Sequence, residues 1–252
     1  AKGEIIDATD PMGRLVLNHD DANVETWVTR AKSRVVKKFS GQNPSADYFA
    51  SDVSIDSKGT AEFTLNTPVG SQPIKLGLLG NHNVLNAVAS SAVAMEAGAN
   101  LMHVKAGLES VKPVCGRLSL ANGINQCKVL DDTYNASPSS FKAAIDVLTS
   151  FSGEKVLVAG DMKELGMKSE EFHEQIGEYA ANSGIGKLYA IGEKSCYMVR
   201  AFGSGAKHFS SRTELIDECR GIASPTLVFL VKGSRGSRME AVIKELRKAE
   251  ED

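Results

Sequence analysis

The stretch Val129-Leu-Asp-Asp-Thr-Tyr-Asn-Ala-Ser-Pro-Ser-Ser-Phe141 contains the pattern that decides the fold of this chain. Its apolar start ends in two carboxylates, Asp131 and Asp132, which is typical of a buried strand that reaches the edge of a sheet. Ser137 suits the N-cap of a following helix, and Pro138 suits its first helical position. We therefore expect a strand end that opens onto a helix N-terminus, where open α/β sheets bind ligands and phosphate groups.

The sequence after this stretch alternates between strand and helix patterns. Strands are expected over residues 127–131, 156–159, 188–191, 207–209 and 226–231, and helices over residues 138–149, 169–182, 193–201, 212–221 and 235–249. Such alternation predicts right-handed βαβ units and a Rossmann-like domain with a mostly parallel sheet.

The sequence before residue 112 has a different build. Between Tyr48 and Leu76, apolar residues recur at every second position in runs separated by turn residues, which predicts an antiparallel meander. The other elements expected in this half are short strands at 15–17 and 35–36 and helices at 21–31, 84–97 and 101–110.

Lys112-Pro113 marks the expected domain boundary, because proline stops the preceding helix. We expect one domain over residues 1–112 and another over residues 113–252. The expected fold class is α/β, with a mixed sheet containing the meander in the first domain and a Rossmann-like second domain.

The composition excludes several classes of function. The 252 residues carry a formal net charge of -2 at pH 7, without the basic excess typical of nucleic-acid binding. No apolar run approaches the ~20 residues that a membrane helix needs, so we expect no integral membrane contact. Four cysteines, Cys115, Cys127, Cys196 and Cys219, show no metal-ligand spacing and fit a reducing, cytoplasmic setting.

Two stretches are candidates for recognising a nucleotide. In Gly80-Asn-His-Asn-Val-Leu-Asn86, the amides of Asn83 and Asn86 share one helix face and offer donors beside acceptors, as an adenine edge requires. The alternative is simple capping of the Ala-rich helix that follows. In Gly116-Arg117, the guanidinium could stack on a base or pair with a phosphate, and the alternative is an ordinary surface ion pair.

Three predicted strands deliver polar residues to one edge of the second sheet. The first ends at Asp131 and Asp132, the second at Gly160-Asp161 followed by Lys163 and Glu164, and the third at Lys232, Ser234 and Arg235. The chain has no Gly-x-Gly-x-x-Gly motif, which argues against a dinucleotide-dependent oxidoreductase, and this sequence also contains no P-loop motif. The convergence of three strand ends is stronger evidence for a site than any one motif.

Taken in order along the chain, these motifs resemble the Mur ligase family. The resemblance rests on five stretches: Gly80-Asn-His-Asn-x-x-Asn86, Gly116-Arg117, Leu130-Asp-Asp-x-Tyr-Asn-Ala-x-Pro138, Gly160-Asp-Met-x-Glu-Leu-Gly166 and Lys232-Gly-Ser-Arg235. It implies a cytoplasmic enzyme of peptidoglycan precursor synthesis that uses ATP and Mg²⁺ to form an acyl phosphate. The closest pattern within the family implies ligation of D-Ala-D-Ala to UDP-N-acetylmuramoyl-tripeptide.

The resemblance also implies where this chain lies in such a ligase. The family's P-loop and metal ligands precede the region that Ala1 resembles, so we expect Mg²⁺ ligands outside this chain and no activity from the chain alone. Residues 1–112 would then be the C-terminal part of the central ATP-binding domain. Residues 113–252 would be the Rossmann-like C-terminal ligase domain.

The resemblance assigns expected roles to residues of this sequence. Asn83 and Asn86 would contact adenine, Arg117 the base or the phosphates, and Asp131 the ribose hydroxyls. Lys232 and Asp161 would act as catalytic residues near the acyl phosphate, and Tyr134, Asn135 and Ser234 would bind the acceptor dipeptide. No residue of the chain is expected to bind a metal ion.

The sequence leaves three alternatives open. The chain could belong to another Mur ligase or to a ligase similar to folylpolyglutamate synthetase, which would share the ATP chemistry but use other substrates. The second alternative is a nucleotide-binding oxidoreductase, against which the missing dinucleotide motif argues. A non-catalytic nucleotide-binding module with a Rossmann-like fold would bind nucleotide without turnover, which distinguishes it from a ligase.

Overall fold

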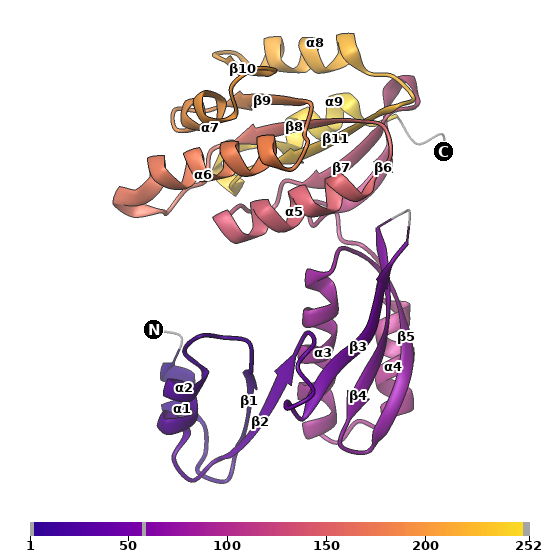
Figure 1. Ribbon diagram of the computed structural model, residues 1–252, viewed down its shortest axis with the longest axis vertical. Helices are drawn as coiled ribbons and strands as arrows, with labels where there is room; N and C mark the ends of the chain where they lie inside the picture. The colour runs from indigo at the N-terminus through magenta and orange to yellow at the C-terminus, as the bar shows by residue number, and fades with distance from the viewer. Residues whose placement is uncertain (1–2, 57–58, 249–252) are drawn as a thin grey trace. The chain divides into compact units, whose positions relative to one another are not determined.

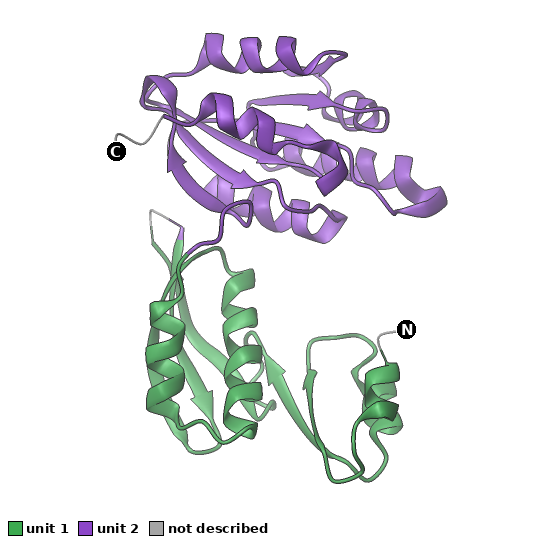
Figure 2. Cartoon of the chain, turned by 180° about the vertical axis from the view of Figure 1, so that it is seen from behind, with its two compact units in different colours: residues 1–56, 60–112 green, residues 57–59, 113–252 purple. Residues whose placement is uncertain are grey.

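The computed structural model describes residues 3–56 and 59–248 and divides into two compact units. Unit 1 comprises residues 1–56 and 60–112, and unit 2 comprises residues 57–59 and 113–252 (Figure 2). None of the helices in the described ranges combines the length and apolarity needed to cross a bilayer.

Unit 1 contains a five-stranded mixed sheet with the order β1-β2-β3-β4-β5. Its strands are β1 (Arg14–Asn18), β2 (Val35–Ser40), β3 (Tyr48–Ile55), β4 (Thr60–Thr67) and β5 (Gly70–Leu79). The first three strands pair in parallel, and β3, β4 and β5 form an antiparallel meander. The meander predicted from the period-two pattern is therefore confirmed.

Four helices accompany this sheet (Figure 1): α1 (Glu4–Ala8), α2 (Val24–Ala31), α3 (His82–Glu96) and α4 (Leu101–Ser110). Alternate residues of the meander, such as Phe63, Leu65 and Ile74, pack with Val84 and Val88 of α3 in the core. The helix expected from residue 21 begins at Val24, and the short helix α1 has no counterpart among the expected elements.

Unit 2 contains a six-stranded sheet with the order β10-β9-β8-β11-β7-β6. Its strands are β6 (Ser119–Asn122), β7 (Lys128–Asp132), β8 (Glu154–Gly160), β9 (Lys187–Ile191), β10 (Ala206–Phe209) and β11 (Leu227–Lys232). All pair in parallel except β6, which pairs antiparallel with β7 at the edge. The predicted Rossmann-like domain is confirmed, although the short strand β6 was not expected.

The helices of unit 2 form two layers around this sheet (Figure 1). They are α5 (Pro138–Ser150), α6 (Ser169–Asn182), α7 (Ser195–Phe202), α8 (Arg212–Ile222) and α9 (Glu240–Leu246). The chain moves from β7 through β8 and β9 to β10 in one direction along the sheet and then returns to β11. Because such crossovers are right-handed, α5, α6 and α7 cover one face, and α8 and α9 cover the other.

An apolar core lies between the sheet and the layer formed by α8 and α9. Val129, Val158 and Phe229 point from the central strands to that face, where Leu215 of α8 and Val242 of α9 pack on them. Strands buried on both faces read as nearly continuous apolar runs, as residues 227–231 do.

The prediction of a single long helix over residues 235–249 is wrong at its start. A 3₁₀ turn over Arg235–Ser237 comes first, and α9 begins only at Glu240. Arg238 between them has φ 50° and ψ 45°, a left-handed conformation that cannot continue a right-handed helix. Residue 249 lies outside the described residues.

The close contact between α6 and α7 gives a first testable prediction. A Cβ atom on Gly177 of α6 would lie 2.2 Å from the carbonyl oxygen of Met198 in α7. Gly177→Ala should therefore lower the free energy of unfolding by about 1–3 kcal/mol, the usual cost of overpacking.

Gly221→Ala is the matched control in the same unit, because a Cβ on this helical glycine would meet no atom within 4 Å. It should raise stability by about 0.5–1 kcal/mol through helix propensity. Urea unfolding followed by circular dichroism measures both variants, and a Gly177→Ala protein as stable as the wild type would refute the close packing.

Candidate functional site

Three neighbouring strands of unit 2 end at one edge of the sheet, which we name the rim. It consists of residues 131–135 at the end of β7, 160–163 at the end of β8 and 232–235 at the end of β11. Because β11 pairs in parallel with both β7 and β8, the carboxyl ends of all three lie side by side. The structure thus brings together seven candidate residues that were chosen separately: Asp131, Tyr134, Asn135, Asp161, Lys232, Ser234 and, through its contact with Tyr134, Arg117.

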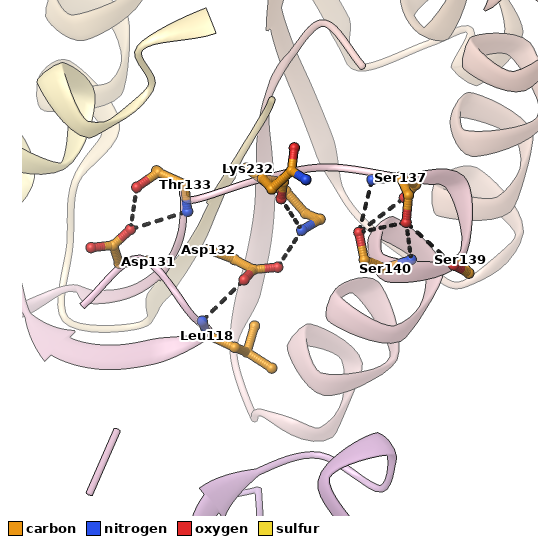
Figure 3. Close-up of polar contacts among 9 residues, drawn as sticks. Leu118, Asp131, Asp132, Thr133, Ser137, Ser139, Ser140 and Lys232 are labelled. Carbon is orange, nitrogen blue, oxygen red and sulfur yellow. Dashed lines mark hydrogen bonds and ion pairs between the residues drawn. The ribbon is translucent and has the colours of Figure 1, made fainter. Parts of the chain in front are cut away.

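Asp131 is a buried residue of the rim, with 4% of its surface exposed. Its Oδ1 accepts hydrogen bonds from the backbone N–H of Thr133 at 3.2 Å and from Thr133 Oγ1 at 2.7 Å (Figure 3). Its Oδ2 accepts one from the N–H of Gly116 at 3.2 Å. Three of the roughly four acceptor positions of this carboxylate are therefore already used within the fold.

Lys232 and Asp132 form a buried ion pair between β11 and β7 (Figure 3). The Lys232 side chain is 1% exposed, and its ammonium donates to Asp132 Oδ2 at 2.5 Å and to the carbonyl oxygen of Asn135 at 3.0 Å. Asp132 Oδ1 also accepts from the N–H of Leu118 at 3.1 Å. Burial lowers the pKa of Lys232, and the neighbouring Asp132 carboxylate opposes that shift.

Asp161 ties the end of β8 to two other segments. Its Oδ1 accepts from the backbone N–H groups of Lys194 at 3.1 Å and Ser195 at 2.7 Å, at the start of α7. Its carbonyl oxygen accepts from Ser234 N–H and from Ser237 Oγ, both at 3.0 Å. The carboxylate that was expected to act in catalysis is thus engaged with the N-terminus of a helix.

Ser234 and His173 hold the loop that follows β8. Ser234 is buried, and its Oγ accepts from the N–H of Lys163 at 2.8 Å. The imidazole of His173 is fully buried and contacts the carbonyl oxygen of Ser169 through Nδ1 at 2.6 Å. Its Nε2 accepts from the N–H of Met162 at 3.0 Å, so the proton resides on Nδ1.

Two guanidinium groups lie close to the exposed aromatic ring of Tyr134 on the rim. Tyr134 is 48% exposed, and the Cζ of Arg117 lies 4.2 Å from its ring centroid. The Cζ of Arg235 lies 6.0 Å from the same centroid. Within the described ranges no carboxylate pairs with either arginine, so both guanidinium groups are free to bind an anion.

The helix that follows the rim begins as predicted. Ser137 is the N-cap of α5 and forms a reciprocal capping box with Ser140 (Figure 3), and Pro138 is the first helical residue. The backbone N–H of Ser140 is therefore satisfied by a side chain within the helix itself.

The two candidate asparagines lie on α3 of unit 1. The Nδ2 of Asn83 donates to the carbonyl oxygen of Leu79 at 2.8 Å, and its Oδ1 accepts from the Nδ2 of Asn86 at 3.1 Å. Asn83 is half-buried, whereas Asn86 is exposed and keeps its own Oδ1 free. Of the two amides, Asn86 is the better placed to meet a ligand.

The described residues contain no group of three or more His, Cys, Asp or Glu side chains that could hold a metal ion. The rim carboxylates are instead engaged with Lys232, Thr133 and backbone amides.

Sequence reasoning missed His173 and Thr133. His173 occupies the buried face of α6 with Ile176 and Ala180, at helical spacing, which is the one signal the sequence offers for it. Thr133 follows two carboxylates, and nothing in its neighbours distinguishes it from an ordinary turn residue.

Comparison with known proteins relates both units to one family. The model of the Mur ligase middle domain matches residues 1–94. The model described as the Mur ligase, glutamate ligase domain matches residues 116–235.

Two curated relatives share a name. The chain is 40% identical over 249 residues to the UDP-N-acetylmuramoyl-tripeptide–D-alanyl-D-alanine ligase of Escherichia coli (strain K12), covering 98% of the chain and 55% of that protein. It is 31% identical to the ligase of that name from Bacillus subtilis (strain 168), covering 98% of the chain and 54% of that protein. The chain therefore spans about half the length of the curated relatives it matches.

Solved structures agree with the fold. A crystal structure of MurF from Acinetobacter baumannii superposes with a TM-score of 0.89 at 32% identity, covering 97% of the chain and 54% of that protein. The MurF ligase of Thermotoga maritima in complex with ADP has a TM-score of 0.81 at 24% identity, with 97% and 55% covered.

The buried ion pair gives a prediction with a distinctive pH dependence. Asp132→Asn keeps the shape but leaves the Lys232 ammonium without its counter-charge, which should cost about 3 kcal/mol of stability. In this variant the pKa of Lys232 should fall further, because the one group that raises it is gone. The unfolded chain then binds more protons than the folded one, so stability should rise as the pH approaches the ordinary lysine value of 10.5.

Thermal unfolding across this pH range measures how much less stable Asp132→Asn is than the wild type. This loss of stability should shrink as the pH rises. Glu245→Gln is the control, since it removes one partner of the exposed pair with Arg220 in the same unit. That change should be small at all these pH values. A deficit of Asp132→Asn that is independent of pH would show that Lys232 is not its source.

Proposed function

Because the chain belongs to the Mur ligase family, we propose that it works in an ATP-dependent peptide ligase of peptidoglycan precursor synthesis. The substrates proposed are UDP-N-acetylmuramoyl-tripeptide and D-Ala-D-Ala, as the names of the relatives indicate. Residues 1–112 would be the C-terminal part of the central ATP-binding domain, and residues 113–252 the C-terminal ligase domain. The proposed setting is the cytoplasm, which the four free cysteines support.

The observation that carries this proposal is the rim of unit 2. Hydrogen bonds and an ion pair of Asp131, Asp132 and Asp161 hold its loops, while Arg117 and Arg235 lie next to the exposed ring of Tyr134 without carboxylate partners in the described ranges. A ligase that forms an acyl phosphate must bind several anionic groups at once. Preorganised cations at a strand-end rim suit that task, because they need no rearrangement as charge develops on phosphoryl oxygens.

The structure refines the roles proposed for single residues. Asn86, which has a free amide oxygen, would contact adenine, and Asn83 would orient it. Arg117 would bind the base or the phosphates. Asp131 keeps about one free acceptor position, so we propose that it holds Gly116 in place and accepts from one ribose hydroxyl at most.

The other proposed roles lie on the remaining loops of the rim. Tyr134, Asn135 and Ser234 would face the acceptor dipeptide. Lys232 and Asp161 remain the residues proposed for catalysis, but their contacts favour a role in positioning the rim loops. Lys232 is buried against Asp132, and Asp161 caps α7. Mg²⁺ would supply charge neutralisation on ATP, and no ligand for it is proposed among the described residues.

The similarities favour this ligase over the other ligases of the family. A UDP-N-acetylmuramate–alanine ligase structure from Thermotoga maritima is 17% identical to the chain. A structure of the diaminopimelate-adding ligase is 18% identical. Both values lie well below the 40% identity of the Escherichia coli relative.

The activity test uses a complete ligase that contains this sequence. With ATP, Mg²⁺ and UDP-N-acetylmuramoyl-tripeptide supplied, phosphate release should require D-Ala-D-Ala and should match amide formation one to one. Release that is indifferent to the dipeptide, or no amide product by mass spectrometry, would contradict the proposed function.

The two asparagines of α3 give a separate prediction in the same enzyme. Asn86→Ala should raise the KM for ATP about tenfold, because a bidentate amide contact with a base contributes about 1–3 kcal/mol. Its melting temperature should stay near that of the wild type, since the Asn86 side chain is exposed.

Asn83→Ala should raise the same KM and also lower the melting temperature, because it removes the hydrogen bond to the Leu79 carbonyl. Steady-state kinetics at varied ATP and thermal unfolding separate the two effects. Unchanged KM values for ATP in both variants would disprove the adenine assignment.

A further inference from the structure

The roles proposed above assign no particular ligand to two cations of the rim, Arg235 and Lys163. Arg235 is exposed and begins the 3₁₀ turn after β11, where Ser237 N–H donates to the Ser234 carbonyl at 2.8 Å. The hydrogen bond from Ser234 N–H to the Asp161 carbonyl fixes the start of this turn. Arg235 therefore projects from a backbone that is held on both sides.

The side chain of Lys163 lies against the same turn. A Cβ atom on Gly236 would be 2.8 Å from Lys163 Nζ and 3.1 Å from its Cε, so the ammonium packs over the peptide next to Arg235. The N–H of Lys163 is also bonded to Ser234 Oγ. No carboxylate in the described part of the chain forms an ion pair with either Lys163 or Arg235.

The contrast with Lys232 decides which cations can bind a ligand here. Lys232 is three residues earlier, but its charge is matched by Asp132 and its side chain is buried. Arg235 and Lys163 have neither a counter-charge nor burial. The capacity to bind an anion at the end of β11 therefore lies with Arg235 and Lys163.

We propose that Arg235, assisted by Lys163, binds the C-terminal carboxylate of the acceptor dipeptide; this inference rests on the proposed function. A guanidinium presents a planar fork of donors that matches a carboxylate, and a neighbouring ammonium adds charge without demanding a fixed geometry. The ring of Tyr134, which Arg235 approaches at 6.0 Å, offers an apolar surface for an adjoining alanine methyl group.

The position of Arg235 favours the dipeptide over the nucleotide. Arg117 adjoins Gly116, which Asp131 holds on the side proposed for the nucleotide. Arg235 instead adjoins Ser234, which is proposed to bind the dipeptide. Arg235 also lies in the turn over which the Lys163 side chain packs. The two arginines on Tyr134 would thus serve two different anions.

The test compares two substrates in a complete ligase that contains this sequence. D-Ala-D-Ala carries the carboxylate, and D-Ala-D-alaninamide replaces it with a neutral amide of similar size. The wild type should prefer the acid in kcat/KM by about tenfold or more, as expected for a charge-assisted bidentate contact.

Arg235→Ala should raise the KM for D-Ala-D-Ala by a similar factor and should no longer distinguish the acid from the amide. Arg235→Lys should fall between, since it keeps the charge and loses the fork. The KM values for ATP and for the UDP-linked substrate should stay unchanged. Arg220→Ala, which alters an exposed arginine paired with Glu245, is the control and should behave as the wild type.

Three results would overturn the proposal. An equal loss on both dipeptides would mean that Arg235 supports only the local fold. A rise in the KM for ATP or for the UDP-linked substrate, with the dipeptide KM unchanged, would assign Arg235 to another anion. A wild-type enzyme that ligates neither dipeptide would remove the proposed function itself, and this inference with it.

Discussion

The geometry of the rim depends on one buried ion pair, Lys232 with Asp132. Taking two charges out of water is costly, and the pair is stable only because its remaining hydrogen-bonding capacity is also used. The ammonium reaches the Asn135 carbonyl, and the carboxylate accepts from Leu118 N–H. This single contact therefore joins the ends of β7 and β11 to the segment that leads into β6.

Three further polar side chains extend the same scaffold. Asp131 holds Gly116, Asp161 holds the start of α7, and His173 holds the loop after β8. Each uses its side chain to satisfy backbone N–H groups of the surrounding loops and helix start that would otherwise lie unpaired. Two guanidinium groups, on Arg117 and Arg235, remain in contact with solvent on this rigid frame, which is how a preorganised anion site differs from a flexible charged surface.

Much of this arrangement could be predicted from the sequence, and the rest depends on the order of the strands. The apolar patterns predicted the different architectures of the two units. The helix cap at Ser137 was also predictable, because a serine followed directly by proline is a local pattern. The burial of Lys232 was not predictable, because it follows from β11 inserting between β7 and β8, which no local pattern encodes. The left-handed Arg238 likewise breaks a helix whose periodicity continues through it.

A double-mutant cycle on Lys232 and Asp132 tests the central claim most directly. Lys232→Met, Asp132→Asn and the double variant would be compared by native-state hydrogen exchange of the β11 amides, which reports the opening of unit 2 alone. The account predicts a coupling free energy of at least about 1.5 kcal/mol, within the range measured for close charge pairs. Effects that add within about 0.5 kcal/mol, as at independent sites, would contradict it.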